Sequence, residues 1–179
     1  MKWQNEERGE GYYYITGTVT EWLPLLARAD IRRAICYEIR VALARCKASL
    51  CAFVIMPDHL HMVVYLPNPG QLHAFLKCWR GRSARRMIDI LLRQNDEAVL
   101  RVLARHANGD CSYAAWKEQA RAWAPVTKRT LRQKIDYVHA NPVRKGLVDV
   151  LQDWPHSSWV WYEMQQQTML PVTPPEGLV

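Results

Sequence analysis

The sequence of 179 residues contains no apolar run of the roughly 18 residues that a membrane-spanning helix requires. Its first eight residues, MKWQNEER, are too polar for a secretory signal peptide. We therefore expect a cytoplasmic protein without a membrane partner. Hydrophobic residues make up 49% of the chain, which is enough to build the core of one domain.

Cysteine pairs at metal-binding spacing are also missing. The chain has five cysteines, an odd number, and none of them forms a CxxC pair. Four lie in apolar surroundings: Cys36, Cys46, Cys51 and Cys78. We interpret them as reduced core residues of a cytosolic protein, and a zinc finger is not expected.

Phenylalanine is scarce, with two residues against eight tryptophans and eight tyrosines. The formal net charge is +7 and the isoelectric point is about 9.3, which suits a polyanionic partner, most often nucleic acid. Aromatic rings beside basic side chains bind single-stranded nucleic acid by base stacking and phosphate contacts. We expect at least half of these rings to lie in the core instead.

The first half of the chain predicts a strand, a helix, a two-stranded hairpin and a second helix. A β-branched and aromatic run predicts a strand from Tyr12 to Val19. Apolar residues at helical spacing predict a helix from Ile31 to about Cys46, with Asp30 as its N-cap. The remaining elements are strands 50–56 and 59–66, joined by a turn at residues 57–58, and a helix over residues 72–93.

The second half is less regular. Residues 113–126 are interpreted as a fourth strand, and Thr127 or Thr130 as the cap of a helix that Pro142 should end. The order of elements predicts an α+β fold with a ferredoxin-like βαββαβ core. This core has a four-stranded antiparallel sheet, and a C-terminal helix carries Tyr137. We expect one domain over residues 1–162 and a polar, proline-rich, mobile tail over residues 163–179.

The stretch MPDHLHMVV contains two histidines within a run that otherwise resembles a buried strand. Side chains alternate faces along a strand, so His59 and His61 point the same way, about 7 Å apart. Two imidazoles on one sheet face can share one divalent metal ion. Two partly exposed histidines beside a turn are the alternative interpretation of this pattern.

Tyr137 and Asn141 lie four residues apart in the last predicted helix and should project together. A helix beside the histidine strand could bring both to a metal ion held by His59 and His61. The alternative for Tyr137 is a core tyrosine on an amphipathic helix.

Three motifs in order, MPDHLHMVV, DYVHANPVRKGLV and DWPHSSW, resemble the single-tyrosine HUH transposases of the IS200-like superfamily. The sequence is most similar to their REP-associated tyrosine transposases, from about Tyr12 to Tyr162. The segment Trp116-Lys117-Glu118 also resembles a tryptophan-containing strand of that family. The residues that follow it, Ala120-Arg121-Ala122, depart from the family pattern of an aromatic and then a polar residue.

The resemblance implies cleavage and joining of single-stranded DNA through a covalent 5′-phosphotyrosine with release of a free 3′-OH. By motif, Tyr137 is the nucleophile, His59 and His61 are metal ligands, and Asn141 is the third protein ligand. The ion would be Mg²⁺ or Mn²⁺, which neutralises charge that develops on the phosphate. A phenol is a poor nucleophile but a good leaving group, so a 3′-OH can reseal the strand.

The implied partner is single-stranded DNA folded into a hairpin, bound by a monomer or a homodimer. Basic side chains that could hold its phosphates are Arg80, Arg82, Arg85, Arg86, Arg144 and Lys145. The arginine run on the second helix could equally be a solvated face. Two other functions remain open: a non-catalytic nucleic-acid-binding module with surface aromatics, and a degenerate transposase that acts as a DNA-binding regulator.

Overall fold

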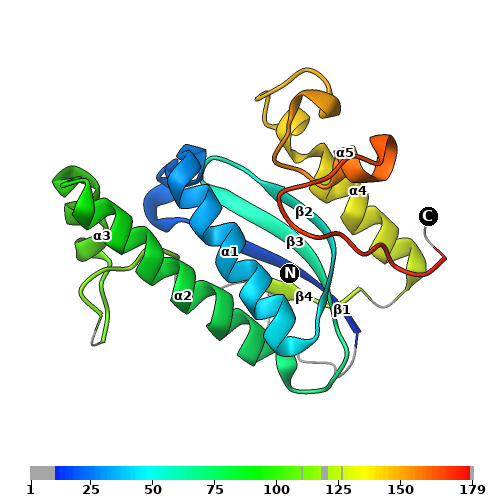
Figure 1. The fold of residues 1–179 in the computed structure, drawn as a ribbon, viewed down its shortest axis with the longest axis horizontal. Coiled ribbons are helices and arrows are strands. Elements are labelled where there is room, and N and C mark those ends of the chain that lie inside the picture. Colours follow the sequence, from blue (N-terminus) through cyan, green and yellow to red (C-terminus); the bar gives the residue numbers. More distant parts are fainter. Residues whose placement is uncertain (1–10, 110, 118–120, 126, 178–179) are drawn as a thin grey trace.

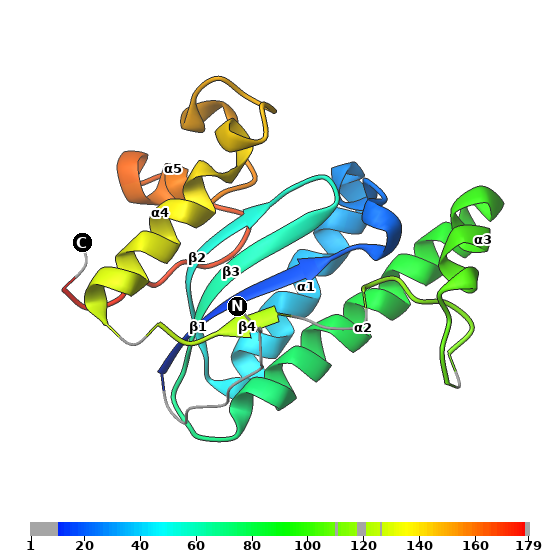
Figure 2. The same cartoon turned by 180° about the vertical axis from the view of Figure 1, so that it is seen from behind.

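The computed structural model describes residues 11–109, 111–117, 121–125 and 127–177. Residues 1–10, and Glu118 and Ala120 of the segment that resembles the family's tryptophan-containing strand, lie outside these residues. Figures 1 and 2 show a four-stranded sheet with two long helices on one face and a third helix on the other. The described elements are β1 Gly11–Thr18, α1 Ala29–Cys46, β2 Ser49–Ile55, β3 His59–Leu66, α2 Gln71–Arg93, α3 Glu97–Arg105, β4 Arg121–Trp123, α4 Lys128–Arg144 and α5 Trp159–Met164, with short 3₁₀ turns at Thr20–Trp22, Leu25–Ala27 and Leu151–Asp153.

The sheet has the strand order β2-β3-β1-β4, and neighbouring strands are antiparallel. This is the order that a split βαβ core produces, so the predicted ferredoxin-like fold is confirmed. Strand β3 lies in the interior of the sheet and pairs with both β1 and β2. The predicted strand His59–Leu66 is confirmed at both ends.

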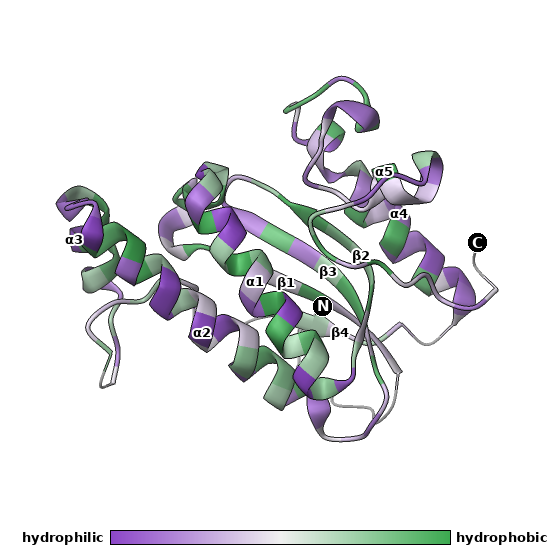
Figure 3. Cartoon of the chain, in the orientation of Figure 1, coloured by the Kyte–Doolittle hydropathy of each residue, from purple (hydrophilic) through white to green (hydrophobic). Residues whose placement is uncertain are grey.

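Helices α1 and α2 cover one face of the sheet and form the main core with it. Hydrophobic and hydrophilic residues alternate along both helices in Figure 3, and the buried apolar residues of each helix belong to this core. Leu60, Met62 and Val64 of β3 point into it, as the strand alternation predicts. Trp79 of α2 is fully buried here and its indole ring lies against Gly17 of β1.

Helix α4 packs on the opposite face, where a smaller apolar cluster joins it to the sheet. Leu131, Ile135 and Val138 supply its buried side. Both candidate caps act together at its start, because the Thr127 and Thr130 side chains each bond the other residue's backbone N–H in a capping box. The helix therefore begins at a fixed point, which sets the register of every residue after it.

The C-terminal segment closes the outer edge of β2. The Ile55 backbone N–H donates to the His156 carbonyl, and the Thr173 N–H donates to the Leu50 carbonyl. Leu170 is buried in the main core. The described part of the tail, predicted to be mobile, thus packs against the domain and covers backbone groups that an edge strand would otherwise expose.

Three local predictions need correction. Asp30 is not the N-cap of α1, because the helix begins at Ala29 and the Asp30 carboxylate accepts from Gln94 Nε2 (2.7 Å). Pro142 does not end α4, which continues to Arg144. In place of a strand over residues 113–126, the described residues show only the short β4 and an isolated bridge between Val19 and Trp116.

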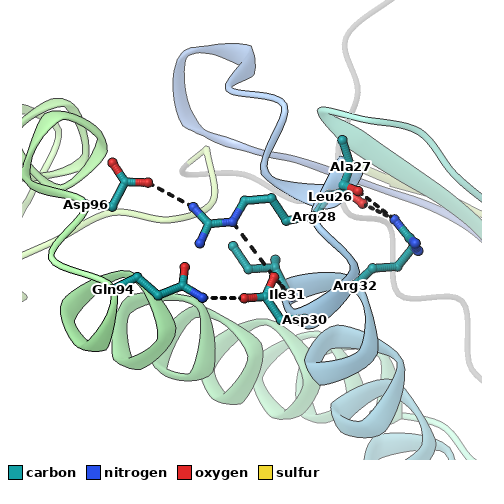
Figure 4. Close-up of polar contacts among 8 residues, drawn as sticks. All are labelled: Leu26, Ala27, Arg28, Asp30, Ile31, Arg32, Gln94 and Asp96. Atoms are coloured by element: carbon teal, nitrogen blue, oxygen red, sulfur yellow. Dashed lines mark hydrogen bonds and ion pairs between the residues drawn. The ribbon is translucent and has the colours of Figure 1, made fainter.

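Figure 4 shows why α1 begins before Asp30. Arg28, just ahead of the helix, donates to Asp96 Oδ2 (2.8 Å). Asp96 is itself the N-cap of α3, since its side chain accepts from the Val99 backbone N–H. The start of α1 is therefore fixed by tertiary contacts to the α2–α3 junction, which local sequence does not reveal.

Replacing Gly17 by alanine should destabilise the protein. A Cβ at residue 17 would lie 2.6 Å from Trp79 Cη2, and overpacking of this kind costs roughly 1–3 kcal/mol of unfolding free energy. Gly81→Ala in α2 is the matched control, because a Cβ there meets no atom within 4 Å and alanine favours a helix by about 0.5–1 kcal/mol. Urea denaturation should show opposite shifts for the two variants; equal shifts would contradict the packing described.

Candidate active site

A cavity of about 620 Å³ opens between the sheet and α4, on the face opposite α1 and α2. All four residues predicted from the two main motifs line it: His59, His61, Tyr137 and Asn141. The two motifs are far apart in the sequence, and the packing of α4 brings them together. Three lysines also line it, Lys117, Lys134 and Lys145, and no acidic side chain is among its described lining residues.

The two histidines lie on one face of β3, as predicted, with ring centroids 4.9 Å apart. Each is only 6% exposed. His59 donates from Nδ1 to the Asp58 carboxylate (2.5 Å), which fixes the orientation of its ring. Its Nε2 atom is therefore the nitrogen left to act as a ligand.

Two hydroxyl groups of β1 orient His61. Its Nδ1 lies 2.8 Å from the Tyr14 Oη atom and 2.9 Å from the Thr16 Oγ1 atom. Either oxygen can accept from an Nδ1–H, an arrangement that leaves Nε2 as the ligand nitrogen. Burial, aided by repulsion from His59, lowers the pKa of His61 to about 3, although a hydrogen bond with Asn141 partly offsets this. His61 is therefore neutral at neutral pH, which is the state that can bind a metal ion.

Asn141 is held by its own helix. Its Nδ2 donates to the Tyr137 carbonyl (2.7 Å), so its Oδ1 is the atom that can act as a ligand. Among the described residues, no group of three His, Cys, Asp or Glu side chains could hold a metal ion. Two imidazole nitrogens and one amide oxygen nevertheless form a donor set that suits a divalent ion and leaves positions open for water and substrate.

Tyr137 lies beside this donor set. Its ring centroid is 5.8 Å from that of His61 and 6.1 Å from that of Tyr14. Two cations lie over its ring, with Lys134 Nζ 5.5 Å and Arg144 Cζ 5.0 Å from the centroid. Because α4 stays helical through Pro142, Tyr137 and Asn141 keep the i,i+4 spacing and share one face.

The six basic residues predicted to hold phosphate separate into two groups. Arg144 and Lys145 lie at the cavity, whereas Arg80, Arg82, Arg85 and Arg86 are on α2 in the other layer. Arg82 and Arg86 pair with the Glu38 carboxylate (2.5 and 3.2 Å), which is 1% exposed. The Arg80 guanidinium donates to the Lys117 carbonyl. Arg82 and Arg86 thus neutralise a buried charge, and binding of phosphate by the α2 arginines stays a prediction.

Sequence analysis gave no role to Tyr14, Thr16, Trp22, Lys117 or Lys134, all of which line the cavity. Three of them had a usable signal. Tyr14 and Thr16 alternate along β1 and so must share one face of the sheet. Lys134 lies three residues before Tyr137 and therefore on the same side of α4. Trp22 and Lys117 lie in irregular segments, whose positions only the fold determines.

Comparison with known proteins supports the resemblance on which these roles depend. No protein-family model matches the chain. A protein of Haemophilus influenzae described as a putative REP-associated tyrosine transposase is 29% identical over 110 residues, covering 60% of this chain and 57% of the relative. The aligned part thus spans little more than half of that relative.

A solved structure of a REP-associated tyrosine transposase bound to a REP hairpin aligns over 100% of this chain and 99% of its own, with a TM-score of 0.67 and 15% identity. A putative transposase from Deinococcus radiodurans aligns over 77% of this chain and 95% of its own, with a TM-score of 0.48 and 19% identity. The first of these comparisons shows that the fold is that of a tyrosine transposase. The particular resemblance predicted from the three motifs, to REP-associated tyrosine transposases, is confirmed.

Removing the partners of Glu38 should lower stability, because a buried carboxylate would be left without a counter-charge. We expect Arg82→Met/Arg86→Met to lower the urea midpoint well below that of the wild type. Arg85→Met is the control, since Arg85 is an exposed residue of the same helix. Adding Glu38→Gln to the double variant should restore part of the loss. A double variant as stable as Arg85→Met would show that the pair of arginines is dispensable.

Proposed function

We propose that this protein is a metal-dependent endonuclease and strand transferase that acts on single-stranded hairpin DNA through a 5′-phosphotyrosine intermediate. The observation that carries the proposal is the convergence of His59, His61, Asn141 and Tyr137 on one cavity. A pure nucleic-acid-binding module does not require paired histidines and a tyrosine that meet at one point. The resemblance to REP-associated tyrosine transposases supports the same conclusion.

The ligand set supports a divalent ion at the histidines. His59 and His61 would bind it through Nε2 and Asn141 through Oδ1, while Asp58, Tyr14 and Thr16 orient the histidine rings. A bound ion would polarise a phosphodiester and neutralise its developing charge. Imidazole nitrogen suits Mn²⁺ better than the strictly oxygen-preferring Mg²⁺.

The charge of the cavity suits a phosphodiester. Lys117, Lys134 and Lys145 line it, and a cavity lined by charges of one sign concentrates ligands of the opposite sign. Lys134 and Arg144 also lie over the Tyr137 ring. Cations beside the ring offset the negative charge that develops as the tyrosine oxygen attacks a phosphate.

In the proposed reaction the Tyr137 phenolic oxygen attacks the scissile phosphorus and gives up its proton to solvent. A new bond forms between the phenolic oxygen and phosphorus, and the bond between phosphorus and the 3′-oxygen breaks. The 3′-oxygen takes up a proton and leaves as a free 3′-OH, while the 5′-phosphate stays on the tyrosine. A second 3′-OH can reverse the step, so the energy of the broken bond is retained for strand transfer.

The described residues place Tyr137 and both histidines of a single chain at the same cavity. Exchange of α4 between two subunits is therefore not needed to complete the site. We propose that a monomer can carry out cleavage. The hairpin as substrate follows from the solved neighbour, which is bound to a REP hairpin.

Tyr137→Phe should abolish the covalent adduct while leaving hairpin binding within about twofold of the wild type. The substitution removes only the attacking oxygen and keeps the ring between Lys134 and Arg144. A denaturing gel with labelled single-stranded hairpin DNA from beside the gene measures the adduct, and a gel shift measures binding. Tyr12→Phe is the control for loss of a phenol, because Tyr12 lies on β1 but does not line the cavity, and it should still form adduct. Undiminished adduct in Tyr137→Phe would exclude this nucleophile.

Adduct formation should require a divalent ion and should occur at lower Mn²⁺ than Mg²⁺ concentrations. Chelation should remove it, and His59→Ala, His61→Ala and Asn141→Ala should each raise the Mn²⁺ concentration needed by at least tenfold, as lost ligands do. His156→Ala serves as control, because His156 does not line the cavity. Titration of Mn²⁺ by electron paramagnetic resonance checks binding independently of activity. Equal Mn²⁺ affinity in all variants would disprove the shared site.

A further inference from the structure

Trp22 is exposed at the rim of the cavity. More than half of its side chain, 54%, is accessible to solvent, although indole rings are usually largely buried. It lines the same cavity as the histidine pair, and its ring meets His59 edge to face with centroids 5.9 Å apart. A large flat ring therefore stands in solvent immediately beside a proposed catalytic residue.

The backbone holds Trp22 in an uncommon conformation. Glu21 has φ 53° and Trp22 has φ 55°, two consecutive residues in the left-handed region that side chains other than glycine rarely adopt. The segment is fixed just ahead of them, because the Val19 N–H donates to the Asp58 carbonyl and the Thr20 N–H to the Ala115 carbonyl. The ring position is thus coupled to the turn that precedes His59.

Lys117 lies beside the Trp22 ring. Its Nζ atom lies 4.5 Å from the Trp22 ring centroid, and its backbone N–H donates to the Thr18 carbonyl (2.9 Å), which holds Lys117 beside β1. An aromatic ring next to a lysine is the combination that binds single-stranded nucleic acid. The ring stacks on a base, and the ammonium group contacts a phosphate.

A second cavity of about 320 Å³ adjoins the first, and Lys117 lines both. Its lining includes the polar residues Thr20, Glu21 and His106. The Thr20 hydroxyl is buried and has no hydrogen-bond partner among the described residues. The Glu21 carboxylate lies 3.1 Å from His106 Nε2. A carboxylate and a hydroxyl can bond the edge of a base that carries an amino group.

We propose that Trp22 and the second cavity form a nucleobase site for the nucleotide next to the scissile phosphate. Trp22 stacks on the base, Lys117 contacts the adjoining phosphate, and Glu21 accepts a hydrogen bond from the base amino group. The site would select an amino-bearing base over thymine at this one position. This inference rests on the proposed function, because it places single-stranded DNA in the histidine cavity.

The test measures whether the contribution of Trp22 to binding depends on the base at a single position of the DNA. Binding is measured in the Tyr137→Phe background, which prevents cleavage, with oligonucleotides that carry one abasic position at a time along the single-stranded flank. Loss of a base stack weakens binding by about tenfold. At one position next to the cleavage site, the abasic change should cost about tenfold with Trp22 present and little in Trp22→Ala. Trp22→Phe should restore most of the coupling.

Tyr37→Ala is the matched control for loss of an exposed ring. Tyr37 is 56% exposed and lies on α1, in the layer away from the cavity, so its loss should leave binding unchanged. At the coupled position, thymine should bind more weakly than cytosine or adenine, and Glu21→Ala should remove this preference.

The outcomes separate the two proposals. Coupling at one position in a chain that forms no covalent adduct supports the nucleobase site and contradicts the proposed cleavage. Additive losses for Trp22→Ala at every abasic position contradict the nucleobase site, whether or not the adduct forms. Coupling that appears equally with Tyr37→Ala would likewise overturn the assignment to Trp22.

Discussion

Helix α4 packs through Leu131, Ile135 and Val138 onto the face of the sheet that β2 and β3 present. This contact sets the distance between Tyr137 and the histidine pair, which lie far apart in the sequence. The capping box at Thr127 and Thr130 fixes where the helix begins, and its continuation past Pro142 keeps Asn141 on the same side as Tyr137. The apolar stripe of the helix thus positions the polar residues on its flank.

The sheet serves two purposes because strand side chains alternate faces. Leu60, Met62 and Val64 enter the core formed with α1 and α2, while His59 and His61 point into the cavity under α4. A shift of β3 by one residue would exchange these two sets. Its central position, paired on both sides by β1 and β2, prevents such a shift. The strand that is most buried is therefore also the one that can hold two imidazoles at a constant separation.

Positive charge on the molecule has more than one role. Sequence composition alone suggests that all the basic residues serve a polyanionic partner. Arg82 and Arg86, however, neutralise the buried Glu38 carboxylate in the layer behind the sheet. Of the cavity lysines, Lys134 lies on α4 and Lys145 directly follows it. Lys117 lies in a segment that is hydrogen-bonded to the end of β1. Net charge describes the whole chain, and only the fold separates basic residues that face a ligand from those that stabilise the interior.

The sequence by itself determined the strands and long helices that carry the site, because hydrophobic periodicity and turn residues are local properties. It also placed His59 with His61 and Tyr137 with Asn141, since the first pair follows from the alternation of side chains along a strand and the second from the i,i+4 spacing of a helix. Tertiary structure alone decided the start of α1 at Ala29, the short β4, the packing of the tail on β2 and the pairing of Arg82 and Arg86 with Glu38. Trp22 and Lys117 belong to the same group, because their positions depend on contacts between segments distant in sequence. Such contacts leave no periodic pattern in the chain.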